Sequence, residues 1–393
     1  MNSNIVELRP HQVALLIAVF LSAFSAPLTI PFNIGTIIST FGTTRAEAGI
    51  VVTVEGVCIS LASIICSRLI VRHRVRKLLV VGVSVVAVSN ALTLLASDVV
   101  FMIYCRALAG AGCGIVLCVV MATAARTRNP EMMYGWISGS IGAFLSLLAI
   151  MLPVVISHGG LAGAYGLYTA FSVAGMFLVI GVPNIKGSCE ESGSIDFFQS
   201  KQKRIRADVI GWIALLGIGF FYFGQAGIAA FVERIGVGNG ISLTTIGNIL
   251  FASGILTIFG SIGAGVVGSR FGSTKPLILV SGLLCVSVLN IAVIDSVFGY
   301  FLGVPMIWLL PAIMLPSFLG GLAVIDPAGR LAGAYPAFAT MGGALGPVTA
   351  GAVADSGGFG SLGWFIVAMI ILGSALMAGA TTKANRLRVM PAI

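Results

Sequence analysis

The sequence is dominated by runs of about 20 apolar residues separated by short polar stretches. A helix of that length, rising 1.5 Å per residue, spans the roughly 30 Å hydrocarbon core of a bilayer. Backbone polar groups inside lipid must be satisfied within the chain, which favours helices, and the alternating segments of about ten residues typical of a membrane barrel are absent. Twelve runs are present, at residues 12–35, 46–67, 78–97, 99–122, 134–157, 161–183, 209–232, 245–267, 276–295, 299–322, 335–354 and 361–380.

Composition excludes a water-soluble fold of this length. Only 9% of the 393 residues are charged and 58% are hydrophobic, whereas a soluble domain carries about 25% charged residues. The sequence therefore predicts an all-α membrane protein with twelve transmembrane helices.

The positive charges predict the orientation of these helices. Of the 22 Lys and Arg residues, 19 fall in the two tails and in the loops after spans two, four, six, eight and ten. Arg45 and Arg234 lie on the other side, and Arg106 lies within a span. The positive-inside rule makes the rich side, with both termini, cytoplasmic. The net charge of +9 thus reflects topology, and we expect no nucleic-acid partner.

The two halves of the chain repeat each other. Helix-start residues, glycines and loop arginines recur at one spacing of 198 positions, in the pairs Thr44 and Ser242, Gly49 and Gly247, and Arg72 and Arg270. We therefore expect two six-helix bundles in the same orientation, residues 1–183 and 209–393, joined by a cytoplasmic linker at 184–208.

Two motifs give this layout a family resemblance. The fourth span carries Arg106-x-x-x-Gly110-x-Gly112-x-Gly114. The loop after span two holds Arg72, Arg76 and Lys77 in a basic pattern that recurs in part at Arg270, although Val71 stands where an Asp is usual. Over essentially its whole length the chain resembles a major facilitator superfamily transporter.

The resemblance implies that spans one, four, seven and ten line a central cavity. Polar and aromatic candidates for contact with substrate on spans one, seven and ten are Ser25, Thr29, Asn33, Tyr222, Gln225 and Trp308. The prolines in spans one and ten predict bends in those helices.

Glycines spaced by four residues predict close helix packing. Span eleven has Gly342-x-x-x-Gly346-Pro347, a second packing candidate beside the Arg106 motif. Drug-exporting members of the family usually have Gly-x-x-x-Gly-Pro in span five. Here Gly135 and Gly139 lack the following proline, which weakens a multidrug-export interpretation.

Two ionisable residues lie deep in the first half. Glu55 is 11 residues past the Thr44 helix cap, roughly 16 Å deep, and Arg106 is eight residues past Asp98, roughly 12 Å deep. A lone charge there costs about 2.5–3.5 kcal/mol or more, so we expect an ion pair. The pair is either a proton-coupling site or a permanent bridge between spans two and four. Glu233, Asp295 and Asp326 lie near span ends, where we expect them to be solvated.

These features predict a secondary active transporter that moves a small organic solute by alternating access, driven by protons. A facilitative uniporter, an exporter of drugs or metabolites, and a membrane solute sensor are the alternatives. The chain lacks a phosphate-binding loop, and its three histidines lie in different loops, so we expect no enzyme activity, catalytic residues, metal or cofactor. We expect a monomer in the lipid bilayer of the cell membrane. Substrate, coupling ion and direction stay open.

The predicted sidedness can be tested by cysteine labelling. A cysteine placed at Ser200, in the linker 184–208, should resist an impermeant thiol reagent added to intact cells and react after the cells are opened. Strong labelling from outside intact cells would reverse the topology.

Overall fold

A computed structural model describes residues 8–70, 73–127, 130–185, 205–271, 274–294, 296–325 and 330–389 of the chain. Every segment that matches a predicted span is helical. The helices of the first half are α1 (Pro10–Ala23), the short η1 (Pro27–Thr29), α2 (Ile30–Phe41), α3 (Arg45–Leu69), α4 (Val75–Thr93), α5 (Val99–Ala125), α6 (Pro130–Leu178) and η2 (Val179–Gly181). The helices of the second half are α7 (Ile205–Gly238), α8 (Leu243–Phe271), α9 (Thr274–Ala292), α10 (Val297–Ile325) and α11 (Arg330–Val389).

Two of these helices each contain two spans. Non-helical dihedral angles at Gly160 divide α6, and those at Gly358 divide α11. The first predicted span is instead the pair α1 and α2, bent by 58° around η1. With these divisions, the described helices supply the twelve predicted spans, and the all-α membrane fold is confirmed.

Helix starts follow the sequence closely. The Thr44 hydroxyl accepts a hydrogen bond from Glu47 N at 3.2 Å, and the Glu47 carboxylate accepts one from Thr44 N at 3.0 Å, so the predicted Thr44 cap of α3 is part of a capping box. Asp98 caps α5 through Phe101 N at 2.8 Å. Ser242 caps α8 through Thr245 N at 3.2 Å. These caps fix where the spans start, and hence the depth of the residues that follow.

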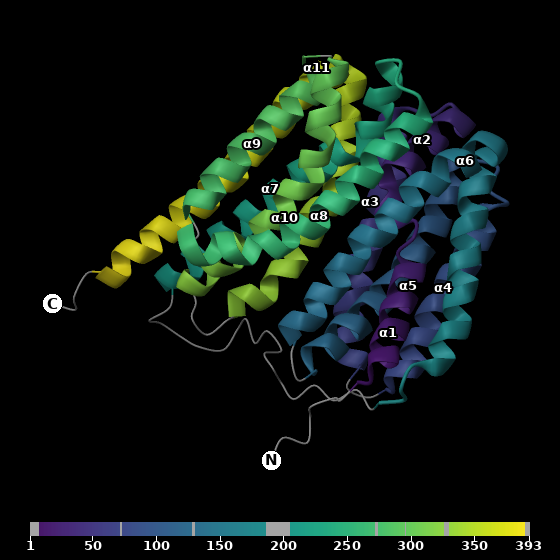
Figure 1. Cartoon of the computed structure of the whole chain (residues 1–393), viewed down its shortest axis with the longest axis horizontal. Helices are drawn as coiled ribbons and strands as arrows, with labels where there is room; N and C mark the ends of the chain where they lie inside the picture. The colour runs from purple at the N-terminus through teal and green to yellow at the C-terminus, as the bar shows by residue number, and fades with distance from the viewer. Residues whose placement is uncertain are drawn as a thin grey trace.

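The helices form two groups that lie side by side (Figure 1). The purple-to-blue helices of the first half contact the green-to-yellow helices of the second through α3 and α11, α6 and α8, and α2 and α7. In Figure 1 the two groups lie close together at the top of the view and diverge toward the side that carries both chain ends.

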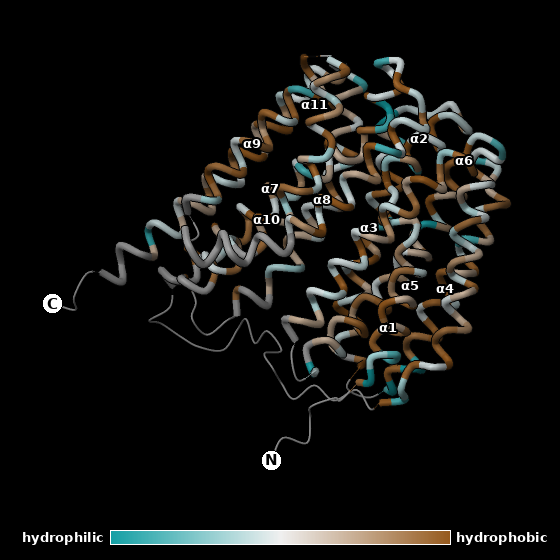
Figure 2. Tube along the Cα trace, viewed as in Figure 1, coloured by the Kyte–Doolittle hydropathy of each residue, from teal (hydrophilic) through white to brown (hydrophobic). Residues whose placement is uncertain are grey.

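The outer surface is apolar, as a lipid-facing surface requires. Large hydrophobic side chains such as Leu95, Phe298 and Phe177 are about 70% exposed, which would be unusual over a wide surface of a soluble monomer. Hydrophobic residues dominate the middle of the helices in Figure 2, and hydrophilic ones gather toward their ends. The chain is therefore built to be surrounded by hydrocarbon.

The 198-residue spacing recurs in the backbone. Among the residues that the structure describes, four glycines have a positive φ, and they form two pairs at this spacing, Gly42 with Gly240 and Gly160 with Gly358.

Contacts between the halves repeat at the same spacing. A side chain at Gly49 would meet the Pro347 carbonyl, and one at Gly247 would meet the Ala149 carbonyl. Gly247 follows Gly49, and Pro347 follows Ala149, by 198 positions. These repeats support the predicted duplication into bundles 1–183 and 209–393, which stays a proposal.

The break at Gly160 depends on glycine. Its φ of 53° with ψ of −136° is a conformation that other residues adopt only with strain, so Gly160→Ala should lower the free energy of unfolding by about 1–3 kcal/mol. Gly166→Ala, in regular helix with no atom near the added methyl group, should leave stability unchanged or slightly higher. Thermal unfolding of the two variants in detergent provides the comparison, and equal melting temperatures would contradict it.

Candidate transport site

Arg106 lies on the face of α5 that packs against α3. Gly110 and Gly114 follow it at one-turn intervals, and a side chain at either would collide with the α3 backbone, at the carbonyls of Glu55 and Ile59 respectively. Gly112 points elsewhere, with the Gly82 carbonyl of α4 2.7 Å from an added Cβ. The motif therefore lets α3 approach α5 so closely that Glu55 stands beside Arg106.

The Arg106 guanidinium is enclosed by partners from three other helices. Its Nη1 donates to Glu55 Oε1 at 3.4 Å, and its Nη2 donates to Asn90 Oδ1 at 2.9 Å and to Thr93 Oγ1 at 2.8 Å. The guanidinium carbon lies 4.7 Å from the centre of the Tyr165 ring. The Arg106 side chain is 1% exposed and that of Glu55 6%, so the predicted pair exists and is dry.

Hydrogen bonds extend this cluster to the break in the first span. Asn90 donates to Ser172 Oγ at 3.0 Å, and Ser172 lies one turn after Tyr168 on α6. The Tyr168 hydroxyl donates to Asn33 Oδ1 at 2.8 Å and lies 2.6 Å from Thr29 Oγ1. Asn33 in turn donates to the Ala26 carbonyl at 2.8 Å, across the bend. The bend of the first span is therefore tied to the surroundings of Arg106.

The candidates on the first span are buried in the first bundle in this conformation. Ser25, Thr29 and Asn33 are at most 3% exposed. Thr29 and Asn33 belong to the hydrogen-bonded cluster, and Ser25 donates to the Ser22 carbonyl at 3.1 Å. Their contact with a substrate stays a prediction.

The candidates of the second half are partly exposed. The Tyr222 hydroxyl of α7 lies 2.7 Å from that of Tyr335 on α11, and the Tyr222 ring packs against Phe221 and Phe318. Gln225 donates to the Ile307 carbonyl of α10 at 3.3 Å, next to Trp308. Aromatic rings and polar tips thus gather where α7, α10 and α11 meet.

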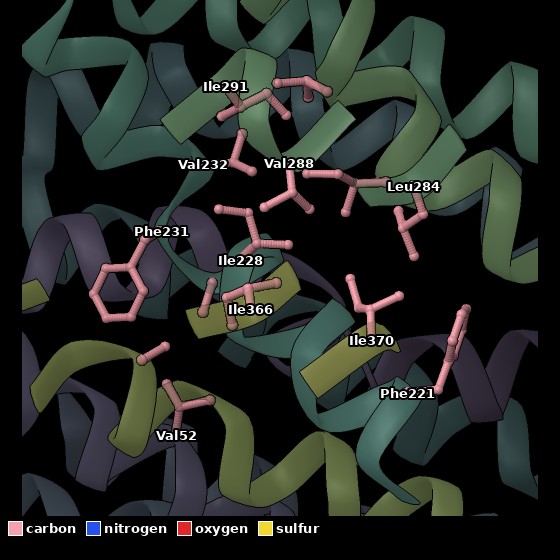
Figure 3. Close-up of a cluster of buried hydrophobic side chains, with 14 of the residues drawn as sticks. Val52, Phe221, Ile228, Phe231, Val232, Leu284, Val288, Ile291, Ile366 and Ile370 are labelled. Carbon is pink, nitrogen blue, oxygen red and sulfur yellow. The ribbon is translucent and has the colours of Figure 1, made fainter. Parts of the chain in front are cut away.

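The second half holds no copy of the ion pair. Adding 198 to the positions of Glu55 and Arg106 leads to Ser253 and Val304, both buried. The same shift takes Asn90, Thr93 and Tyr168 to hydrocarbon side chains of the buried cluster in Figure 3, namely Val288, Ile291 and Ile366. In that cluster apolar side chains of α7, α9 and α11 pack against one another. The second half thus has no counterpart of the Glu55–Arg106 pair at the equivalent positions.

The loop-motif residues are described in part. Arg76 donates from Nε to the Val182 carbonyl at 2.7 Å, which joins the start of α4 to the end of the sixth span. Lys77 is exposed. Arg72, Asp295 and Asp326 lie outside the described residues, and Arg270 is described only as part of the backbone of α8.

The glycines of span eleven face α7. A Cβ at Gly342 would collide with the Gly219 carbonyl, and one at Gly346 would lie 2.8 Å from Gly227 N. The Pro347 carbonyl lies against Gly49 of α3. These residues lie where helices approach most closely.

Two charged contacts join the halves on the side away from the chain ends. Arg45 pairs with Asp355 of α11 at 3.7 Å and donates to the Ala354 carbonyl at 2.9 Å. Arg234 of α7 donates to the Gly35 carbonyl and, at 2.5 Å, to Ser39 Oγ of α2. These are the two arginines that the charge count placed on the charge-poor side.

The expectation that Glu233 is solvated is wrong. Glu233 is 6% exposed because its carboxylate fits against Gly35 of α2. Its place near a helix end suggested water, but packing of α2 over α7 removes that water. The sequence signal was its 198-residue correspondence with Gly35, the residue it contacts.

A family comparison identifies the fold. A family model described as Major Facilitator Superfamily matches residues 15–325. The chain belongs to the Major Facilitator Superfamily. It is a multi-pass membrane transporter for a small-molecule substrate and not an enzyme, which confirms the resemblance inferred from the Arg106 motif. No curated protein matches the chain by sequence.

Solved structures of other transporters share this fold. A bacterial homologue of the human lysosomal transporter Spinster, inward-facing and occupied, is 14% identical with a TM-score of 0.72, over 98% of this chain and 100% of that one. The nucleoside transporter NupG, as a D323A mutant, is 15% identical with a TM-score of 0.68, over 95% and 99%. The human organic anion transporter MFSD10 is 15% identical with a TM-score of 0.64, over 94% and 100%.

Removing Arg106 should lower the free energy of unfolding more than removing Glu55. Arg106→Gln leaves Glu55 buried without a counter-charge and should cost about 3–5 kcal/mol of unfolding free energy. Glu55→Gln should cost less, because Asn90 and Thr93 still bind Arg106. The double variant should cost less than the sum of the two single changes.

Denaturant unfolding in detergent measures all three variants. Arg45→Gln removes a half-exposed ion pair and serves as a control, with an expected cost of about 0–1 kcal/mol. Strict additivity of the Glu55 and Arg106 changes would show that the two side chains do not interact.

Proposed function

We propose that this Major Facilitator Superfamily member is a secondary active transporter that moves a small organic solute across the cytoplasmic membrane, driven by a proton gradient. Both termini are cytoplasmic, on the basis of the charge distribution. The divergence of the two bundles toward the termini (Figure 1) supports an inward-facing conformation.

The observation that carries proton coupling is the buried Glu55–Arg106 pair. Arg106 has hydrogen-bond partners besides Glu55, so it stays satisfied when the carboxylate moves away. A carboxyl group that loses its counter-charge in an apolar environment binds a proton more readily. A pair that forms in one conformation and opens in the other would take up and release one proton per cycle.

The first span links the transport cycle to the Glu55–Arg106 pair. Tyr168 binds Thr29 and Asn33 at the bend, and Ser172 on the same helix binds Asn90, which holds Arg106. A change in the bend angle would move Tyr168. That movement would shift Ser172 and Asn90 and so displace the Arg106 guanidinium. We therefore assign Tyr168 a positioning role between the bend and the ion pair.

The partly exposed aromatic and polar side chains of the second half suit an organic solute with a ring and a hydrogen-bonding group. Tyr222 and Gln225 offer polar tips, and Trp308 offers a large aromatic surface. We propose that these three residues contact the substrate when it is bound between the halves.

A facilitative uniporter is the second candidate. Glu55 and Arg106 both belong to helices of the first half, so a bundle that moves as a rigid body would leave their pair intact. In that case the pair is a permanent bridge, and transport follows the gradient of the solute itself.

Flux measurements separate the two candidates. A ligand-stabilisation screen of the purified protein identifies a solute, whose uptake is then followed in proteoliposomes with and without an imposed pH gradient. The proton-coupled transporter accumulates the solute only with the gradient, and Glu55→Gln should abolish accumulation while downhill exchange continues.

Glu47→Gln provides the matched control, because Glu47 is the exposed carboxylate of the α3 cap. It should retain accumulation. Accumulation that persists unchanged in Glu55→Gln would reduce the ion pair to a structural bridge.

A further inference from the structure

Glu233 is a second buried carboxylate, and it lies at the contact between the halves. It belongs to α7, and its carboxyl carbon would be 2.6 Å from a Cβ on Gly35 of α2. Gly35 and Glu233 are 198 positions apart, so they are equivalent positions of the repeat that meet each other. Only glycine at position 35 leaves room for the Glu233 side chain.

The surroundings of Glu233 satisfy a carboxylate poorly. Its one ion-pair partner among the described residues is Arg234, at 3.5 Å from Nε to Oε2. Within that part of the chain, neither atom of this pair has a hydrogen-bond partner. The Arg234 Nη2 is directed instead to the Gly35 carbonyl and to Ser39. An ionised carboxylate in a dry contact costs free energy unless hydrogen bonds replace its water.

The other charged contact on this side differs in this respect. Asp355 accepts hydrogen bonds from Arg45 N at 3.2 Å and Ala46 N at 2.8 Å, and its side chain is 29% exposed. Asp355 thus has two backbone donors at a helix start, whereas the buried Oε2 of Glu233 has no hydrogen-bond partner among the described residues.

Few titratable groups surround Glu233. Its own helix supplies Arg234, α10 supplies Tyr300, whose hydroxyl donates to the Val232 carbonyl at 2.8 Å, and α2 supplies none. The described part of α11 supplies Asp355 on this side, where it is engaged with Arg45. Among the described residues, Glu233 is thus the acidic group at the contact of α2 with α7.

We propose that Glu233 is a proton-binding site that links closure of the α2–α7 contact to pH. When the halves separate on this side, water reaches Glu233 and its carboxylate is stable. When they close, the carboxylate takes one proton from that solution and becomes a neutral acid against Gly35, and opening returns the proton to the same side. Arg234 donates hydrogen bonds to the Gly35 carbonyl and to Ser39, and these bonds stabilise the closed contact whether Glu233 is ionised or neutral.

This inference rests on the alternating access proposed above, but its test needs no substrate. A ketone-bearing amino acid is placed at Thr40 and at Val237, both exposed at the ends of α2 and α7, so that spin labels attach and the native cysteines stay in place. Double electron–electron resonance then gives the distance between the labels across about pH 5 to 9 in lipid nanodiscs.

The closed population should grow as the pH falls. Because one proton is bound, the ratio of closed to open molecules should change by at most about tenfold per pH unit. Glu233→Gln, a mimic of the neutral acid, should be closed at every pH, and Glu233→Asp should keep a pH response. In a Glu55→Gln background, where the buried pair of the first half cannot take up a proton, the closed population should still grow as the pH falls, and adding Glu233→Gln should abolish that response. Glu47→Gln, which alters an exposed carboxylate, should respond as the unchanged protein does.

Three outcomes would overturn the assignment. They are a distance that does not depend on pH, a pH response that is lost in Glu55→Gln, and a pH response that survives when Glu233→Gln is added to Glu55→Gln. Hydrogen–deuterium exchange of residues 30–41 in unlabelled protein gives the same comparison if a doubly labelled variant fails to fold. If the pH response depends on Glu233 but the protein shows no proton-driven flux, the Glu233 site is supported and the proposed proton coupling is rejected.

Discussion

The fold of the first bundle depends on satisfying one positive charge inside the membrane. A guanidinium roughly 12 Å deep has no water to bind, so the protein must supply its partners. Three of them, Glu55, Asn90 and Thr93, come from helices that flank α5, and the Tyr165 ring faces the guanidinium from α6. Glycines at one-turn intervals bring α3 close enough for Glu55 to reach. The close approach of α3 to α5 and the pairing of Glu55 with Arg106 therefore depend on each other.

The second bundle repeats the backbone of the first without repeating this chemistry. The paired breaks at Gly160 and Gly358 and the paired contacts of Gly49 and Gly247 show equivalent geometry. Hydrocarbon replaces the polar cluster at Val288, Ile291 and Ile366. At these positions the second bundle packs through hydrocarbon, so it has no counterpart of the Arg106 charge to satisfy there.

The sequence predicts the parts of this structure that depend on local pattern. Apolar runs place all twelve spans, Thr44 predicts the start of α3, and matched depth predicts that Glu55 meets Arg106. Residues whose role depends on the packing of distant helices are not predictable in this way. The role of Tyr168 depends on the packing of α6 against the bend of the first span. The burial of Glu233 depends on the packing of α2 over α7. The polarity of Thr29 and Asn33 indicates that each needs a hydrogen-bonding partner. It does not predict whether their side chains face the central cavity or the inside of the first bundle.

The contact between Gly35 and Glu233 also constrains how such a chain can arise by duplication. Two identical copies carry the same residue at both positions, and those positions touch when the halves close. Two glutamates would place two carboxylates in one dry space, whereas two glycines would leave the contact without an acid. The acid can therefore enter one copy only, which requires two copies that differ in sequence. A pair of identical subunits could not have carried this contact.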